Sequence, residues 1–270
     1  MRLGFCTEFS EEMVKLAKEE GFDCLEIFTG GKFHPARTSD DDVKKAKDLL
    51  DRYGIIAATV FHGDNWVDKG EPALADFRRA MDFAKILGTN IVTCNAWVPP
   101  GKLDEQLPAY KKVFSQFAEW AEDAGVKVAI ENCPHGLHNI AFSPVAWEQM
   151  FDAVPSKAIG LEFDPSHLVF QGIDYIAAIY EFADRIYAFH AKDTEILYRK
   201  LSRQGNLVGG WWRFRVPGWG DVNWQKIFIA LNDIGYNADV IIEHEDPVFS
   251  KERFAEGLRL GLRFLKQFIP

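Results

Sequence analysis

The sequence has few cysteines and no long apolar segment. Its 270 residues include four cysteines, which are scattered without any Cys-x-x-Cys pair (Cys6, Cys24, Cys94 and Cys133). This spacing argues against a zinc ribbon and against a disulfide framework, and it favours a reducing, cytoplasmic location. The N-terminus lacks the apolar stretch of a signal peptide, and no segment is apolar and long enough to cross a bilayer.

The chain also lacks an excess of basic charge. It has 31 Lys and Arg residues against 40 Asp and Glu residues, for a net charge of −9. We therefore expect neither nucleic acid nor an anionic membrane as the main partner. A glycine-rich phosphate-binding turn is missing after the first predicted strand, which argues against a doubly wound sheet that binds a dinucleotide.

Predicted strands and helices alternate along the whole chain. Four of the predicted helices begin at a serine (Ser10, Ser39, Ser143 and Ser250), and five end at a glycine (Gly21, Gly54, Gly88, Gly125 and Gly235). The eight predicted strands span residues 3–6, 24–28, 55–61, 91–94, 127–130, 158–163, 186–189 and 239–242. Regular alternation without a composition break predicts parallel strands joined by right-handed crossovers. The expected fold is α/β, a single (β/α)₈ TIM barrel domain over residues 1–270.

Polar residues end each of the last four predicted strands: Glu131, Asp164, His190 and Glu243. In a barrel of this kind the carboxyl ends of the strands meet at one mouth, where the active site lies. Three carboxylates and one imidazole cannot all sit there charged and unpaired, so the pattern predicts one divalent cation. Oxygen and nitrogen ligands suit Mn²⁺, Mg²⁺, Co²⁺ or Zn²⁺, and the residues alone do not choose among them.

Five short motifs lie at or near these strand ends. They are Ile-Glu-Asn at 130–132, Phe-Asp-Pro-Ser-His at 163–167, Phe-His-Ala-Lys-Asp at 189–193, Val-Pro-Gly-Trp-Gly-Asp at 216–221 and Ile-Glu-His-Glu at 242–245. Together they resemble the xylose-isomerase-like barrel superfamily, which contains sugar isomerases and epimerases, inosose-processing enzymes and AP endonucleases. The resemblance covers essentially the whole chain.

The resemblance implies roles for particular residues. It implies that one Mn²⁺-like ion is held by Glu131, Asp164, His190 and Glu243. Glu131 and Glu243 would also move protons on opposite faces of a sugar. His167 and Arg215 would bind substrate oxygens.

Further candidate substrate contacts come from the strands and loops around the mouth: His62, Asn95, Lys192, Trp97 and Glu26. His62 and Asn95 end the third and fourth predicted strands. Lys192 follows His190 on the same side of the chain, and a surface lysine is the alternative. Glu26 lies inside the second strand, where a structural or substrate-orienting role is expected.

The segment from residue 192 to 222 is long for a barrel connection, which suggests a function. It is rich in arginine and tryptophan (Arg199, Arg203, Trp211, Trp212, Arg213, Arg215 and Trp219), and Trp66 and Trp97 are predicted on the same face. The tryptophans either pack or line a sugar-stacking pocket. The second reading hints at a substrate larger than a monosaccharide, such as a keto-glycoside. The arginines leave a phosphorylated sugar open.

The function predicted first is that of a divalent-metal-dependent isomerase or epimerase. It would move a proton next to a carbonyl of a sugar, keto-sugar or cyclitol through an enediolate, whose oxygens need positive charge. Glu131 and Glu243 would serve as base and acid, unless they are ligands only. A dehydratase or lyase acting on a keto-sugar or keto-glycoside is the second hypothesis.

Two further hypotheses come from other classes. An AP-site nuclease is disfavoured by the net acidity and because Asn95, Arg213 and Arg215 stand where those nucleases carry metal ligands. A sugar-binding protein without catalysis would keep the pocket alone. Association into a homo-oligomer is left open.

Overall fold

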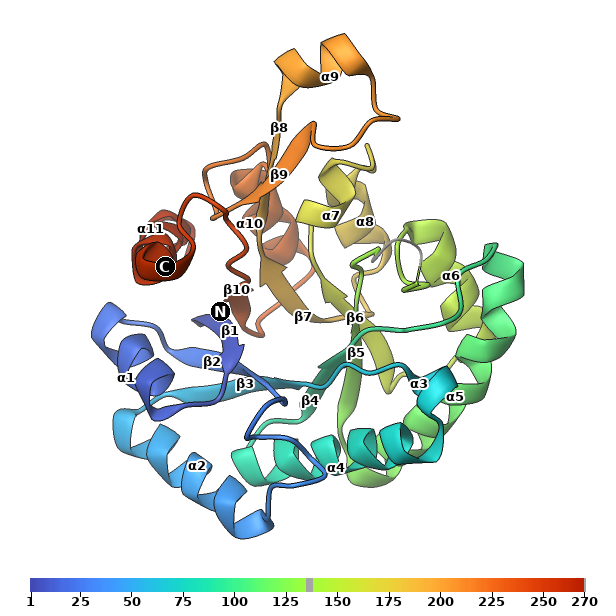
Figure 1. Cartoon of the computed structure of the whole chain (residues 1–270), viewed down its shortest axis with the longest axis vertical. Helices are drawn as coiled ribbons and strands as arrows, with labels where there is room; N and C mark the ends of the chain where they lie inside the picture. Colours follow the sequence, from blue (N-terminus) through green and yellow to red (C-terminus); the bar gives the residue numbers. More distant parts are fainter. Residues whose placement is uncertain (135–137, 270) are drawn as a thin grey trace.

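The structure is a computed structural model that describes residues 1–134 and 138–269. At its centre, eight parallel strands close into a barrel in the order β1-β10-β7-β6-β5-β4-β3-β2 (Figure 1). These strands are β1 (Leu3–Glu8), β2 (Cys24–Phe28), β3 (Ile56–Phe61), β4 (Ile91–Cys94), β5 (Lys127–Glu131), β6 (Ile159–Phe163), β7 (Ile186–Ala191) and β10 (Val240–Ile242). The predicted (β/α)₈ barrel is confirmed, and every predicted strand end lies within two residues of the observed one.

Helices surround the barrel (Figure 1). They are α1 (Glu11–Glu20), α2 (Asp40–Tyr53), α3 (Trp66–Lys69), α4 (Glu71–Leu87), α5 (Leu103–Ala124), α6 (Pro144–Ala153), α7 (Ser166–Val169), α8 (Tyr175–Glu181), α10 (Trp224–Asp233), the short 3₁₀ helix η2 (Lys251–Arg253) and α11 (Phe254–Leu265). One more helix, α9 (Tyr198–Gln204), lies away from the barrel (Figure 1). The short helices α3 and α7 were not predicted. Within the described part of the chain, no helix combines the length and the apolar character needed to span a bilayer.

Local signals explain why several helices could be predicted. The Ser39 side chain accepts a hydrogen bond from the backbone N–H of Asp42 at the start of α2. Gly54 ends the same helix with a φ of 67°, a left-handed conformation that glycine adopts without strain. Each cap satisfies backbone groups that the helix itself leaves without partners.

Aromatic packing fixes the helices on one side of the barrel. Phe77 of α4 and Phe117 of α5 stack with ring centroids 3.9 Å apart. The Trp66 ring meets both rings edge-on and its indole N–H donates to the backbone oxygen of Asn95. Trp66 is therefore a packing residue, one of the two alternatives given for the tryptophans, and it does not line the cavity described below.

The long segment between β7 and α10 contains a projecting arm that the sequence did not predict. Its strands, β8 (Asp193–Ile196) and β9 (Trp212–Arg215), pair antiparallel, and α9 lies between them at the outer end (Figure 1). At the base, the Asp193 carboxylate accepts hydrogen bonds from the backbone N–H groups of Gly218 and Val222 and from the Trp224 indole. This cradle holds β8 against the following loop, so that β9 faces the mouth of the barrel.

Candidate metal centre and active site

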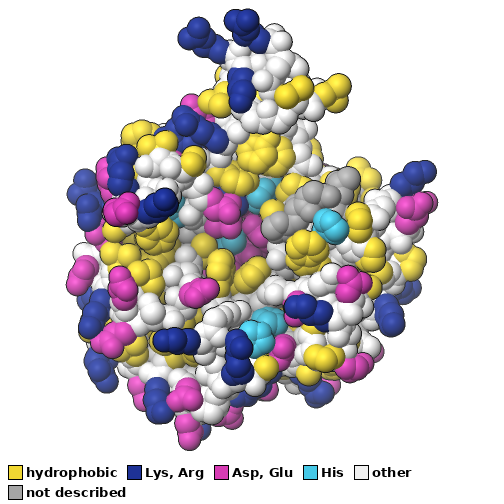
Figure 2. Space-filling view, viewed as in Figure 1, with side chains coloured by type: hydrophobic (Ala, Val, Ile, Leu, Met, Phe, Trp, Pro, Cys, Tyr) yellow, Lys and Arg dark blue, Asp and Glu magenta, His cyan; other side chains and the backbone are white. Residues whose placement is uncertain are grey.

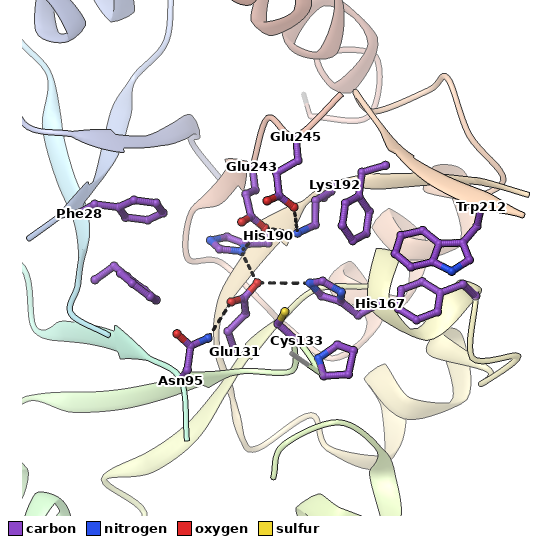
Figure 3. Close-up of a pocket in the computed structure, with 14 residues that line it drawn as sticks. Phe28, Asn95, Glu131, Cys133, His167, His190, Lys192, Trp212, Glu243 and Glu245 are labelled. Atoms are coloured by element: carbon purple, nitrogen blue, oxygen red, sulfur yellow. Dashed lines mark hydrogen bonds and ion pairs between the residues drawn. The ribbon is translucent and has the colours of Figure 1, made fainter. Parts of the chain in front are cut away.

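The carboxyl ends of the barrel strands open into a cavity of about 650 Å³. Figure 2 shows the hollow, with acidic and histidine side chains inside it and hydrophobic side chains around it. The polar residues that line the cavity are Asn95, Glu131, His167, His190, Lys192, Glu243 and Glu245 (Figure 3). They lie in α7 and at the ends of β4, β5, β7 and β10 or just after these strands, so the active face predicted from the fold is where polar groups converge.

One group of side chains has the donors of a metal site. Glu131, Asp164, His167 and Glu243 each offer one ligand atom, and these atoms lie within 4.8 Å of one another. His167 Nε2 lies 3.5 Å from Glu131 Oε1 and 3.3 Å from Asp164 Oδ2. All three of these atoms are buried without a hydrogen-bond partner. Buried, unpartnered carboxylates and an imidazole that face one point fit a divalent cation.

Asp164 is held in place through its backbone. Its N–H donates to Asn132 Oδ1 at 2.6 Å, and its carbonyl oxygen accepts from Asn132 Nδ2 at 2.9 Å. One carboxylate oxygen, Oδ1, accepts from the backbone N–H of Ser166. Only Oδ2 then remains to bind a metal ion. The end of the strand therefore presents one carboxylate oxygen in a fixed direction.

His190 lies between two sets of carboxylates. Its Nδ1 is 3.5 Å from Glu131 Oε1 and 3.3 Å from Glu243 Oε2. Its Nε2 is 3.0 Å from Glu26 Oε2 and 3.2 Å from Glu162 Oε1. His190 therefore touches two of the predicted carboxylate ligands, while His167 joins all three. The roles predicted for the two imidazoles, His190 as the metal ligand and His167 as a substrate contact, stay predictions.

Glu162 is a site residue that the sequence interpretation missed. It lies two positions before Asp164, so strand alternation puts both on the inward face, and that signal was available. Glu162, Glu26 and His190 form a second group with ligand atoms within 4.8 Å of one another, and both carboxylates are fully buried. Burial and the charge of Glu26 raise the pKa of Glu162 well above its usual value.

Lys192 supplies the positive charge at the mouth. Its buried ammonium lies 2.5 Å from Glu243 Oε2, 2.9 Å from Glu245 Oε2 and 3.3 Å from Asp164 Oδ2. Burial by itself lowers the pKa of Lys192, but Glu243 and Asp164 outweigh it and raise that pKa well above its usual value. The ammonium therefore neutralises part of the acidic cluster, and the surface alternative for this lysine is wrong.

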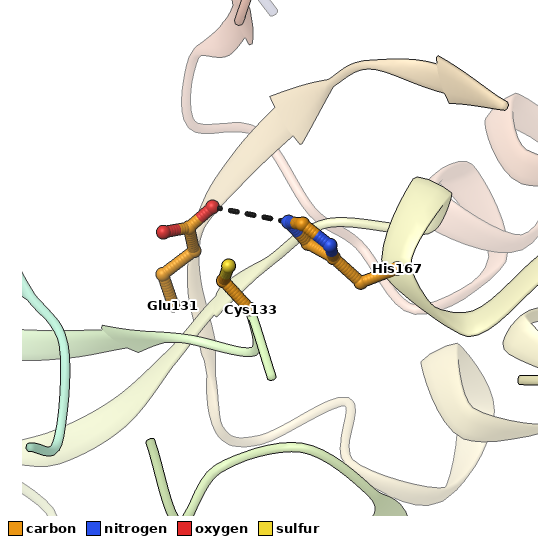
Figure 4. Close-up of side chains that lie close together, drawn as sticks. All are labelled: Glu131, Cys133 and His167. Carbon is orange, nitrogen blue, oxygen red and sulfur yellow. Dashed lines mark ion pairs between the residues drawn. The ribbon is translucent and has the colours of Figure 1, made fainter. Parts of the chain in front are cut away.

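Cys133 is a further residue without a predicted role. Figure 4 shows its sulfur beside Glu131 and His167, and the three offer ligand atoms within 4.8 Å of one another. A thiolate is a ligand that zinc accepts readily. The cavity thus contains two overlapping donor groups that share Glu131 and His167.

A family profile described as xylose isomerase-like TIM barrel matches residues 14–268. The chain belongs to this family. The uncharacterized protein YfiH of Bacillus subtilis (strain 168) is 27% identical, with 96% of this chain and 95% of that protein covered. An inosose dehydratase of Clostridium perfringens (strain 13 / Type A) is 25% identical, with 89% and 88% covered.

Solved structures share the family fold over nearly their whole length. D-psicose 3-epimerase, solved in the presence of D-fructose, superposes with a TM-score of 0.78 at 17% identity and covers 100% of this chain and 99% of its own. The IOLI protein with a binding zinc atom has a TM-score of 0.78 at 22% identity, with 100% and 98% covered. At these identities the likeness shows the fold. The resemblance predicted from the sequence motifs is confirmed at the level of the family.

Of the predicted substrate contacts, three line the cavity of this family member: His167, Lys192 and Asn95. The Asn95 side-chain amide donates to Glu131 Oε2 at 3.2 Å. Glu26 lies behind His190, where it accepts from the Thr93 hydroxyl. Glu26 therefore contacts His190, a predicted metal ligand, and does not line the cavity itself.

Arg215 does not line the cavity. Its Nε donates to Asp246 Oδ2 at 2.8 Å and its Nη1 donates to Glu195 Oε2 at 2.7 Å. Through the bond from Nε to Asp246, it fixes the arm to the loop after β10. His62 and Trp97 are also absent from the cavity lining, and Trp212 alone of the five predicted tryptophans belongs to it.

His62 gives the fold a predictable sensitivity to acid. It is buried, with Nδ1 2.6 Å from the Thr29 hydroxyl, and burial lowers its pKa to about 4. An unfolded histidine has a pKa of about 6.5, so between these values the unfolded chain takes up a proton that the native imidazole refuses. The contribution of the neutral His62 to the free energy of unfolding is therefore fully present above pH 6.5, and it is lost as the pH falls towards 4.

We expect this single histidine to cost about 2–3 kcal/mol of the free energy of unfolding between pH 7 and pH 4.5. Urea denaturation of the natural chain and of His62→Gln at both pH values measures the effect, because all other titrations are common to the two. The variant should lose about 2 kcal/mol less on acidification. Equal losses in the two proteins would contradict the assignment.

Proposed function

We propose that the chain is an enzyme that moves a proton next to the carbonyl of a sugar, keto-sugar or cyclitol with the help of one divalent metal ion. The observation that carries this proposal is the meeting of Glu131, Asp164 and Glu243 with an imidazole at the bottom of one cavity. These carboxylates, with His190 or His167, would hold the ion. Such an ion supplies positive charge to the substrate oxygen that becomes negative as the proton leaves.

The proton transfers fall to the two glutamates. Glu131 Oε1 faces the other candidate ligand atoms, which leaves Oε2, the oxygen that accepts from Asn95 at 3.2 Å, for a reacting proton. Glu243 stands beside the Lys192 ammonium, which favours its charged form and hence its action as a base. One glutamate, as the carboxylate, takes the proton from carbon, and the other, as the carboxylic acid, returns a proton to the same carbon or its neighbour. The first outcome is epimerisation and the second is isomerisation.

Elimination is the second candidate. It is favoured by the inosose dehydratase relative, which aligns over 89% of this chain. The same base breaks the C–H bond beside the carbonyl, and the other glutamate, as an acid, protonates the neighbouring hydroxyl. The C–O bond then breaks and water leaves. The two reactions share their first step and differ only in where the second proton goes.

Proton exchange in D₂O tests the proposal. The protein loaded with Mn²⁺ is incubated in D₂O with ketohexoses, 3-keto-glycosides and an inosose, and the products are followed by NMR. Deuterium at the carbon beside the carbonyl is expected, with an epimer or isomer in the first case and loss of water or of an aglycone in the second. The same protein in EDTA is the control. No exchange with any substrate under Mn²⁺, Mg²⁺, Co²⁺ or Zn²⁺ would reject the proposal.

A further inference from the structure

The cavity has a polar floor and an aromatic side wall. Trp212 lines it on the side of the arm, across the carboxylate cluster from Phe28 (Figure 3). Phe170 and Phe214, whose rings contact that of Trp212, line it as well. Phe170 follows α7, whereas Trp212 and Phe214 belong to β9. The wall is therefore built where the arm meets the barrel, and the Thr194 hydroxyl of β8 joins the two parts by donating to the backbone oxygen of Ser166 in α7.

The aromatic wall is continuous with the candidate metal centre. The rings of Phe170 and Trp212 stack with centroids 4.0 Å apart and planes 3° apart. Trp212 contacts Phe214 at 4.9 Å, and Phe214 meets the His167 ring edge-on at 5.3 Å. Phe214 also lies under the Lys192 ammonium, at 4.4 Å. A molecule seated on the polar floor would therefore touch this wall with its next group.

The chemistry of the two surfaces differs. A sugar ring presents hydroxyl groups, each of which needs a hydrogen-bond partner when it is buried. Carboxylates, imidazoles and the ammonium on the floor provide such partners, whereas phenyl rings provide none. Cavities of roughly 300–1,000 Å³ hold drug-sized ligands, and this one, at about 650 Å³, exceeds what a single sugar ring requires. The remaining space borders aromatic surface.

We propose that Phe170, Trp212 and Phe214 form an aglycone subsite, and that the substrate is a sugar or keto-sugar that carries an aromatic substituent. The proposal rests on the proposed function for the place of the sugar ring, over Glu131 and Glu243. The substituent then lies against the wall, where offset or edge-on ring contacts hold it. Unsubstituted sugars would fill only the floor.

Calorimetry with simple glycosides tests the subsite without any reaction. Phenyl and methyl glucopyranosides, each in both anomeric forms, are titrated into the Mn²⁺-loaded protein. We expect one phenyl anomer to bind on the order of tenfold tighter than its methyl counterpart, because a ring contact adds about a factor of this size. Trp212→Ala should remove most of this difference between the phenyl and the methyl glucoside.

Matched variants locate the effect. Trp211 is the neighbouring tryptophan in the arm; it does not line the cavity, and its indole donates to the backbone oxygen of Asn206. Trp211→Ala should therefore keep the preference for phenyl. Phe170→Leu, outside the arm, should weaken it, and this variant serves if Trp212→Ala does not fold.

The proposal is overturned if phenyl glucosides bind no tighter than methyl glucosides or do not bind at all. It is equally overturned if Trp211→Ala removes the preference as fully as Trp212→Ala, or if a glucose disaccharide binds tighter than the phenyl glucoside. Failure of the proposed function looks different. It gives no exchange in D₂O while the preference for phenyl persists.

Discussion

Replacing Glu131 by glutamine should lower turnover by about 10³-fold, because an amide neither takes up the proton nor contributes a charge to the metal donor set. Glu131 Oε1 is buried without a hydrogen-bond partner and lies within 3.5 Å of both His167 Nε2 and His190 Nδ1. The same Oε1 thus belongs to both candidate ligand arrangements, the one with His167 and the one with His190 as the imidazole ligand. Initial rates of exchange or epimerisation by NMR measure the effect, and circular dichroism checks the fold.

A matched control separates this effect from a general loss of charge near the arm. Glu195 pairs with Arg213 and Arg215 and does not line the cavity. Glu195→Gln should keep turnover within about threefold of the natural chain. Calorimetric titration with Mn²⁺ shows whether Glu131→Gln also loses the metal. More than a tenth of the natural turnover in Glu131→Gln would remove Glu131 from the proton-transfer step.

Replacing Lys192 by methionine should destabilise the metal-free protein by about 3 kcal/mol, since one buried cation then no longer faces three carboxylates. The ammonium lies within 3.3 Å of Asp164, Glu243 and Glu245. This loss is at the low end of what breaking a buried ion pair costs, because Glu245 is 49% exposed and keeps access to water. Urea denaturation in EDTA measures the loss.

Metal should then rescue the Lys192→Met variant. A divalent ion that binds only the native state adds stability, and it should add more where the competing ammonium has gone. Denaturation in saturating MnCl₂ should therefore raise the stability of Lys192→Met more than that of the natural chain. Lys157, in an exposed pair with Asp184, is the control, and Lys157→Met should change stability by less than about 0.5 kcal/mol. If Mn²⁺ raised the free energy of unfolding of both proteins equally, the lysine and the metal ion would not compete for the same carboxylates.

The barrel and its active face could be predicted because they depend on regular, local features. Periodic apolar segments, the serine at the start of α2 and the glycine at its end mark the elements. Once eight parallel strands are recognised, their carboxyl ends must meet, so Glu131, Asp164 and Glu243 were brought together by topology alone. Their common place in the structure confirms that step.

The arm could not be predicted in the same way. β8 and β9 are four residues each and lie on either side of a helix in which no residue is buried. Neither strand has a two-residue turn or a long alternating pattern that would announce a hairpin. The position of the arm depends instead on the Asp193 carboxylate, which accepts hydrogen bonds from backbone groups 25 and 29 residues further along the chain.

The sequence by itself determined the barrel, the family and the carboxylates at the mouth, because strand period and strand ends are local properties. Only the tertiary structure decided the placement of the other side chains: His190 over Glu162, Lys192 among three carboxylates, Arg215 outside the cavity and Trp212 at its wall. The reason is physical. These contacts join residues that are far apart in the chain, such as Lys192 and Glu243 at a separation of 51 positions. The direction of each side chain is then set by packing and by the neighbouring charges, which the order of the residues does not reveal.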